Sequence, residues 1–116
     1  MTSCHRFPRR AAVAAVMTLG SILSGCRRPG PSFAEARAVI VHHCVPCHSE
    51  RTTVPAFPIA AGGVELDTLA QMQRQAERIK LRVVIQRNMP LLNTTQMTDA
   101  ERALLGAWVE SGATGR

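Results

Sequence analysis

The chain has 116 residues, of which 46% are hydrophobic but only 3% aromatic, with three Phe, one Trp and no Tyr. This length allows one small domain, and small cores are commonly supplemented by a cofactor or a covalent staple. The net charge of +6 is in the range of nucleic-acid binders, but the basic residues are scattered and have no aromatic residues among them for base stacking. We therefore expect no nucleic-acid partner.

Residues 1–25 are predicted to be a signal peptide. Arg6, Arg9 and Arg10 precede an apolar run over residues 11–23, and a basic region followed by a short hydrophobic region is typical of exported proteins. The run is shorter than the roughly 20 residues that a membrane-spanning helix needs.

The end of this run predicts a lipid anchor. Leu23-Ser24-Gly25-Cys26 is similar to a bacterial lipobox, in which cleavage before the cysteine yields an N-terminal residue that carries acyl chains. The alternative is an ordinary cleavage site beside a chance cysteine. We expect lipidation at Cys26, with residues 26–31 as a short tether that holds the protein at the periplasmic side of a bacterial membrane. The chain from Cys26 onward keeps 11 basic and 8 acidic residues, a net charge of +3.

Residues 32–116 are predicted to form one all-α domain of three to four helices, because three capping boxes each precede an apolar pattern of helical spacing. The expected helices run from Ser32 to about His43, from Thr68 towards Asn88 with a break near Arg78–Lys80, and from Thr98 to about Ser111, with Gly112 as the stop. Their predicted buried residues are Phe33, Ala36 and Ile40, then Leu69, Met72, Ala76, Ile79 and Val83, then Leu104, Leu105 and Trp108.

The loop over residues 49–63 contains prolines and glycines that interrupt regular structure, and we expect Phe57 and Ile59 to turn inward from it.

The segment directly after the first predicted helix carries the strongest motif. Cys44-Val45-Pro46-Cys47-His48 has the spacing of a haem c attachment site. Two thioethers must reach two vinyl groups on one edge of the macrocycle, and the short spacing brings the next residue, a histidine, under the iron. We predict one covalent haem c held by Cys44, Cys47 and His48, which would also supply the large apolar body that the sequence lacks.

Three other uses of the cysteine pair are weaker. A thioredoxin-like redox pair normally belongs to an α/β pattern, which is absent from the sequence. A zinc site using Cys44, Cys47 and one or two of His42, His43 and His48 would need a further ligand pair, yet no Cys or His follows His48. A disulfide across two residues closes a very small loop and adds little stability.

Met89 is the predicted sixth ligand of the iron. A thioether is a soft axial ligand that raises the reduction potential. Met89 lies in a loop stiffened by Pro90, whereas Met72 belongs to an apolar helical stripe and Met97 directly precedes an N-cap. The alternatives are an open sixth site and ligation by His42 or His43.

The order of these features resembles a small class I cytochrome c: a helix, the haem motif, a loop, further helices, Met89-Pro90 and a final helix with Trp108. The resemblance implies that the first and last helices cross beside one haem. In that crossing, Ala36 and Ile40 are predicted to contact Leu104, Leu105 and Trp108.

A narrower resemblance covers about Phe33–Ala113. It is to the cytochrome c domain at the C-terminus of bacterial membrane-bound urate oxidases. The segments that carry it are His43–Ser49, Gly62–Thr68, Asn88–Leu91 and Met97–Arg102. The multi-span domain of that family, which would bind and oxidise urate, is missing from this chain, and the predicted lipid anchor stands in its place.

These features predict an electron carrier and not an enzyme, because His48 and Met89 would clamp the iron from both sides. The expected partners are redox donor and acceptor proteins, with a membrane oxidase or dehydrogenase as one candidate. Lys80, Arg82 and Arg87 either steer an acidic partner or form a solvated helix face. The alternatives are a haem-based sensor or a peroxidase-type enzyme with an open sixth site, and a haem-binding subunit of a respiratory complex.

Overall fold

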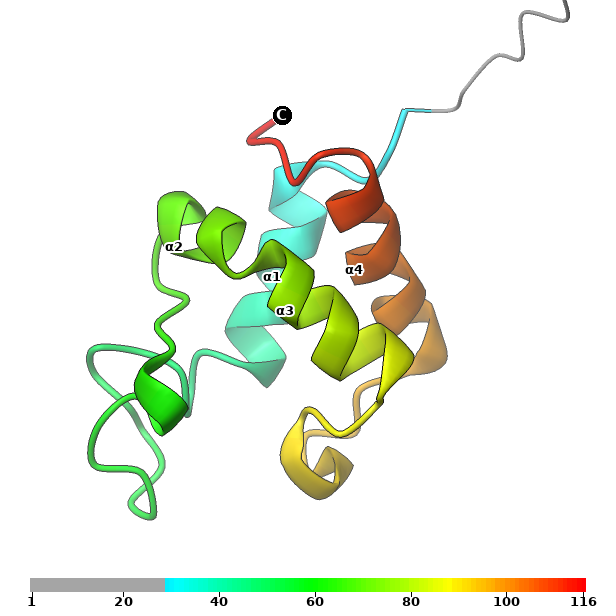
Figure 1. Ribbon diagram of the computed structural model, residues 1–116. Coiled ribbons are helices and arrows are strands. Elements are labelled where there is room, and N and C mark those ends of the chain that lie inside the picture. The colour runs from blue at the N-terminus through cyan, green and yellow to red at the C-terminus, as the bar shows by residue number, and fades with distance from the viewer. Residues whose placement is uncertain (1–28) are drawn as a thin grey trace, which may run out of the picture.

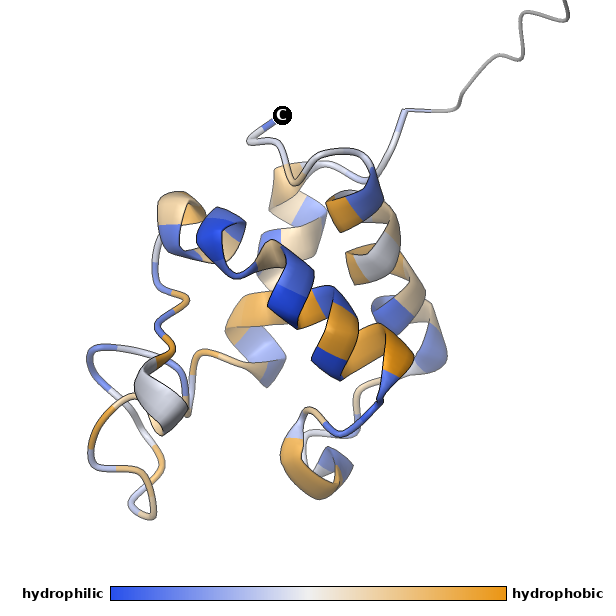
Figure 2. Ribbon diagram, viewed as in Figure 1, coloured by the Kyte–Doolittle hydropathy of each residue, from blue (hydrophilic) through white to orange (hydrophobic). Residues whose placement is uncertain are grey.

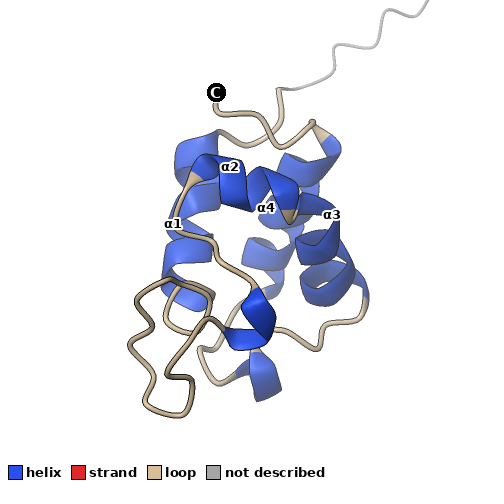
Figure 3. Cartoon of the chain, turned by 60° about the vertical axis from the view of Figure 1, so that its left-hand side comes forward, coloured by secondary structure: helices blue, strands red, loops and turns tan. Residues whose placement is uncertain are grey.

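The computed structural model describes residues 29–116, and the regular elements in this part of the chain are all helical, without strands (Figure 3). The elements are α1 (Phe33–His43), the 3₁₀ turn η1 (Ala61–Gly63), α2 (Leu69–Arg74), α3 (Ala76–Ile79), the π-helical segment η2 (Lys80–Ile85), the 3₁₀ turn η3 (Leu91–Asn93) and α4 (Asp99–Glu110). The predicted all-α class is confirmed. The predicted signal peptide and the lipidation site at Cys26 lie outside the described residues.

All three predicted capping boxes form. In each, the N-cap hydroxyl accepts a hydrogen bond from the backbone N–H three residues on, whose side chain accepts from the N-cap N–H in return. The pairs are Ser32 with Glu35, Thr68 with Gln71, and Thr98 with Glu101. Gly112, two residues after α4, has φ +99°, as expected of a glycine that ends a helix.

The middle helix is divided differently from the prediction. The α-helix is interrupted at Gln75, where α2 ends and α3 begins (Figure 1). At the predicted break near Arg78–Lys80 the chain stays helical and changes from α to π geometry at Lys80. The wider turn accommodates the crowded Val83-Val84-Ile85 run, whose branched side chains lose rotamer freedom in an α-helix.

The core lies between α1 and α4, which pack directly on each other, and α3 and η2 cross α4 (Figure 1). Ile40, Leu105 and Trp108 have no exposed surface. The rings of Phe33 and Trp108 lie 6.3 Å apart between centroids, at an angle of 34°. Apolar residues concentrate in the second half of α1 and in η2, whereas polar residues predominate around α2 and the start of α3 (Figure 2). The predicted contact between the first and last helices is confirmed.

The two ends of the described chain meet at the start of α1. The backbone N–H of Phe33 donates to the carbonyl of Arg116, and the indole N–H of Trp108 donates to the carbonyl of Thr114 at 3.1 Å. The other end of α1 leads directly into the cysteine motif, and the loop after that motif projects from the helices (Figure 3). Within residues 29–116, none of the helices has both the length and the apolar character that a membrane crossing requires.

The packing of α4 predicts the cost of truncating its buried face. Leu105→Ala removes side-chain atoms that have no exposed surface, and we expect it to lower the free energy of unfolding in urea by about 2–5 kcal/mol. Leu81→Ala, the same substitution at a helical residue that is 43% exposed, serves as the control and should cost about 1 kcal/mol or less. Equal losses for the two variants would contradict this description of the core.

Candidate functional site

A cavity of about 540 Å³ lies at the end of α1 that is remote from the chain ends. It is lined by the cysteine motif, by the loop after it, by the face of α3 and η2, and by the loop that follows η2. Most of its lining is apolar, with Phe57, Val64, Leu66, Ile79 and Val83 among the contributors. Such a cavity suits a large apolar ligand better than a small polar one.

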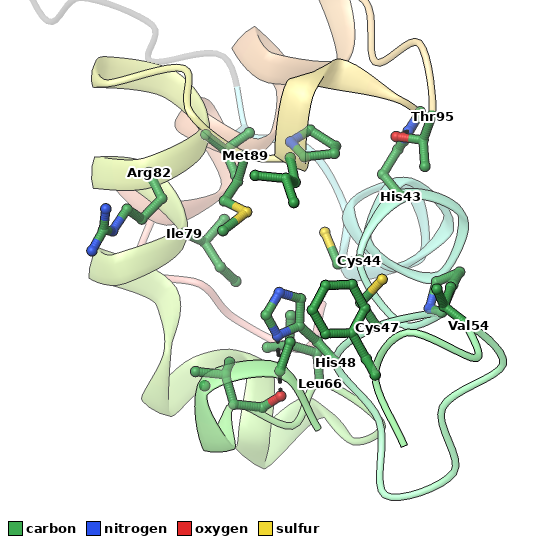
Figure 4. A pocket seen from close by; sticks show the side chains of 18 of the residues that line it. His43, Cys44, Cys47, His48, Val54, Leu66, Ile79, Arg82, Met89 and Thr95 are labelled. Atoms are coloured by element: carbon green, nitrogen blue, oxygen red, sulfur yellow. Dashed lines mark hydrogen bonds between the residues drawn. The ribbon is translucent and has the colours of Figure 1, made fainter. Parts of the chain in front are cut away.

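The cysteine motif is wound as a continuation of α1. The backbone N–H groups of Cys44 and Val45 both donate to the carbonyl of Ile40, at 2.8 and 3.1 Å. The carbonyl of Cys44 in turn accepts from the N–H groups of Cys47 and His48, at 3.1 and 2.9 Å. These tight turns place the side chains of both cysteines and of His48 at the cavity wall (Figure 4).

The loop after the motif is held against it by backbone hydrogen bonds. The carbonyls of Pro46, Cys47 and His48 accept from N–H groups of three loop residues: Thr53 at 3.0 Å, Ala61 at 2.9 Å and Leu66 at 2.9 Å. Hence the motif and the loop form one unit.

The loop prediction is correct for one of its two residues. Phe57 lines the cavity, whereas Ile59 is 77% exposed, so the expectation that Ile59 turns inward is wrong. The hydroxyl of Thr52 donates to the carbonyl of Phe57 and fixes the turn there, and the chain then bends back to Ala61 with Ile59 on its outer side.

His48 is oriented by a hydrogen bond to the loop. Its Nδ1 lies 3.3 Å from the carbonyl oxygen of Val64 (Figure 4). A carbonyl only accepts, so Nδ1 carries the proton and donates, and Nε2 keeps a free lone pair. Histidines that bind metals are commonly fixed in this way through their second nitrogen. The ring of His48 is thereby prepared to offer Nε2 to a metal ion in the cavity.

The two cysteines are free thiols, not a disulfide. Burial raises the pKa of the Cys44 thiol to about 12, and the neighbouring Cys47 contributes to the increase. Redox-active Cys-x-x-Cys pairs have lowered thiol pKa values. The environment of Cys44 therefore does not favour a thioredoxin-like function.

Met89 enters the cavity from the side opposite His48. Its thioether points into the space between them, while the sulfurs of Cys44 and Cys47 lie along another edge (Figure 4). Of the other two methionines considered, Met72 has no exposed surface and Met97 is 3% exposed, and both belong to the helical core. Met89 is thus the methionine of the described chain that lines this cavity.

Both ring nitrogens of His43 are already engaged by other side chains. Its Nδ1 lies 2.8 Å from the hydroxyl of Thr95, and its Nε2 lies 3.1 Å from a carboxylate oxygen of Glu101. With both ring nitrogens engaged, His43 has no nitrogen free to act as a ligand, although its ring contributes to the cavity wall. His42 lies on the exposed side of α1 and does not contribute to that wall.

The three basic residues that were predicted either to steer an acidic partner or to form a solvated helix face have different surroundings. Lys80 pairs with Glu110 at 3.0 Å and Arg87 pairs with Asp99, both on the outer surface. Arg82, together with Arg78 one turn earlier, contributes to the edge of the cavity. Two guanidinium groups at the edge of an apolar cavity suit a ligand that carries carboxylates.

The candidate site therefore unites all four predicted residues that lie within the described chain: Cys44, Cys47, His48 and Met89. Over residues 29–116, no three or more His, Cys, Asp or Glu side chains converge so that they could share one metal ion. Comparisons with protein-family models, with curated proteins and with solved structures gave no match.

The hydrogen bonds that Glu101 accepts from Thr98 and His43 predict an acid-sensitive contribution to stability. Hydrogen bonds, first from the Thr98 backbone and then from His43, lower the pKa of Glu101 from 4.5 to about 2. A carboxylate with a lowered pKa stabilises the folded state above its unfolded pKa, and this contribution is lost as the pH falls through the folded value. The relevant window is about pH 4.5 to 2.

We expect the free energy of unfolding of the wild type to decrease more steeply across that window than that of Glu101→Gln. Urea titrations at several pH values measure both slopes. Parallel slopes for the two proteins would show that Glu101 does not make this contribution.

Proposed function

We propose that this chain is a monohaem c-type cytochrome that carries single electrons, anchored by lipid at the periplasmic face of a bacterial membrane. The observation that carries the proposal is the convergence on one apolar cavity of two cysteine thiols and a histidine from one side and a methionine thioether from the other (Figure 4). Relationship to the small class I cytochromes c, and to the cytochrome domain of membrane-bound urate oxidases, is part of the same proposal.

The residues present fit a haem in three respects. The cavity wall is largely apolar, as a porphyrin face requires. The donor set is an imidazole nitrogen and a thioether, which is a common axial pair in cytochromes c. Arg78 and Arg82 at the edge can neutralise the two carboxylates of the macrocycle.

Each residue then has a defined role. Cys44 and Cys47 would hold the haem covalently through their thiols, and His48 would offer Nε2 to its iron while the Val64 carbonyl accepts from its Nδ1–H. Met89 would hold the iron through its thioether. The bound haem supplies a one-electron couple of the iron. Because His48 and Met89 would both be engaged in holding the iron, the proposed function is electron transfer between a donor and an acceptor protein rather than catalysis.

The first test compares visible spectra of the protein matured in a host that attaches haem c. The oxidised wild type should show the weak sulfur–iron charge-transfer band in the red, and the reduced protein should bind carbon monoxide poorly. Met89→Leu, which conserves volume but removes the sulfur, should abolish the band and allow carbon monoxide to bind. Met72→Leu and Met97→Leu are the matched controls and should leave both properties unchanged.

Other outcomes have specific meanings. Covalent haem without the band in the wild type, together with ready binding of carbon monoxide, would favour a sensor or a peroxidase-type enzyme with an open sixth site. Failure of the chain to acquire covalent haem in a competent host would refute the proposal as a whole.

The lipid anchor has a separate test. Cys26→Ser in the full-length chain should abolish labelling by radioactive palmitate, with the haem spectrum unchanged. Serine preserves size but cannot form the thioether to lipid. A variant that is still labelled would contradict attachment through Cys26.

A further inference from the structure

Arg102 in α4 is buried, with 5% of its surface exposed, unlike every other Lys or Arg of residues 29–116. All eight acidic residues of the chain lie in this part, yet none has a carboxylate oxygen within 4.0 Å of its guanidinium. Burying a cation without a counter-ion is unfavourable unless its N–H groups are satisfied by other acceptors. The role of Arg102 therefore follows from the groups to which it donates.

Its guanidinium joins three segments at the back of the cavity. Nη1 donates to the carbonyls of Val83 and Met89, both at 2.7 Å, and Nη2 donates to Oδ1 of Asn93 at 3.1 Å. Val83 belongs to the π-helical segment, where a carbonyl can lack a helical partner, and Met89 is the proposed sixth ligand. Hydrogen bonds from a charged donor are short and roughly twice as strong as neutral ones.

The loop around Met89, to which Arg102 donates, has a backbone conformation that must be stabilised by contacts with other segments. Four non-glycine residues around Met89 have positive φ: Arg87 at 55°, Leu92 at 52°, Asn93 at 50° and Gln96 at 60°. Side chains disfavour this conformation, which persists only where surrounding contacts impose it. Asn93 receives such contacts, because its Oδ1 accepts from the N–H of Met97 at 3.0 Å and its Nδ2 donates to the Met97 carbonyl at 3.2 Å.

We propose that Arg102 is the positioning residue for the sixth ligand. Its hydrogen bond to the Met89 carbonyl keeps the thioether directed into the cavity, where it would prevent outside ligands from reaching the iron. The inference rests on the proposed function, with Met89 as a ligand. Lysine cannot replace arginine here, since an ammonium group lacks the planar fork that reaches three acceptors from two nitrogens.

The test titrates imidazole into the oxidised, full-length holoprotein and follows the sulfur–iron band. If the population without the Met89–iron bond increases, imidazole binds more tightly in the same proportion. We expect Arg102→Lys to weaken the band and to tighten imidazole binding about ten-fold, with covalent haem content and far-UV circular dichroism preserved. The control is Arg87→Lys, an exposed residue of the same loop, which should match the wild type.

A second variant covers the case in which Arg102→Lys does not fold. Asn93→Gly removes one acceptor of the guanidinium at a residue whose positive φ glycine adopts readily, and it should tighten imidazole binding about three-fold. Wild-type affinity and a wild-type band in folded Arg102→Lys, or in Asn93→Gly alone if the lysine variant does not fold, would overturn the inference. Absence of the band from the wild type itself would instead refute Met89 ligation, and with it the proposed function.

Discussion

The packing of α1 against α4 is the contact on which both sides of the site depend. α1 leads into the turn that carries the cysteines and His48, and α4 carries Arg102, which holds the Met89 carbonyl at 2.7 Å. Trp108, with no exposed surface, and the hydrogen bond between His43 and Glu101 at 3.1 Å connect the two helices. Because this one helix pair positions both proposed ligands, a shift of α1 relative to α4 would directly change the distance between His48 and Met89.

Hydrogen bonds to backbone carbonyls hold each side of the cavity in place. His48 is fixed by the carbonyl of Val64 and Met89 through its own carbonyl, so neither depends on side-chain packing alone. For the proposed electron carrier this matters because a ligand set that changes little between the oxidised and reduced states transfers electrons with little rearrangement. In the proposed cytochrome, the same two hydrogen bonds would help to keep both sides of the iron covered by the protein.

The predictable parts of this structure were those set by short stretches of sequence. The capping boxes were predicted correctly because the hydroxyl, the acid or amide and the backbone all lie within four residues. Met89 was singled out because its neighbour Pro90 marks a loop. The Val64 carbonyl and the contacts of His43 and Arg102 were not predicted, because their partners lie far along the chain. The spacing of Arg102, Leu105 and Val109 on one face of α4 was the available signal that this arginine is buried. The interruption of the helix at Gln75 was not predicted, because neither proline nor glycine, the residues that usually mark such a break, lies near it.

The meeting of the two chain ends at the start of α1 determines how an anchored molecule would be oriented. The proposed tether would join the domain there, whereas the cavity lies at the far end of a helix of 11 residues, which is about 16 Å long. A protein held by lipid at Cys26 would therefore direct its cavity away from the bilayer surface. The proposed electron partners would then have to approach from the aqueous side or extend well above the headgroups, and diffusion in the membrane plane would bring the protein to those with tall extramembrane domains.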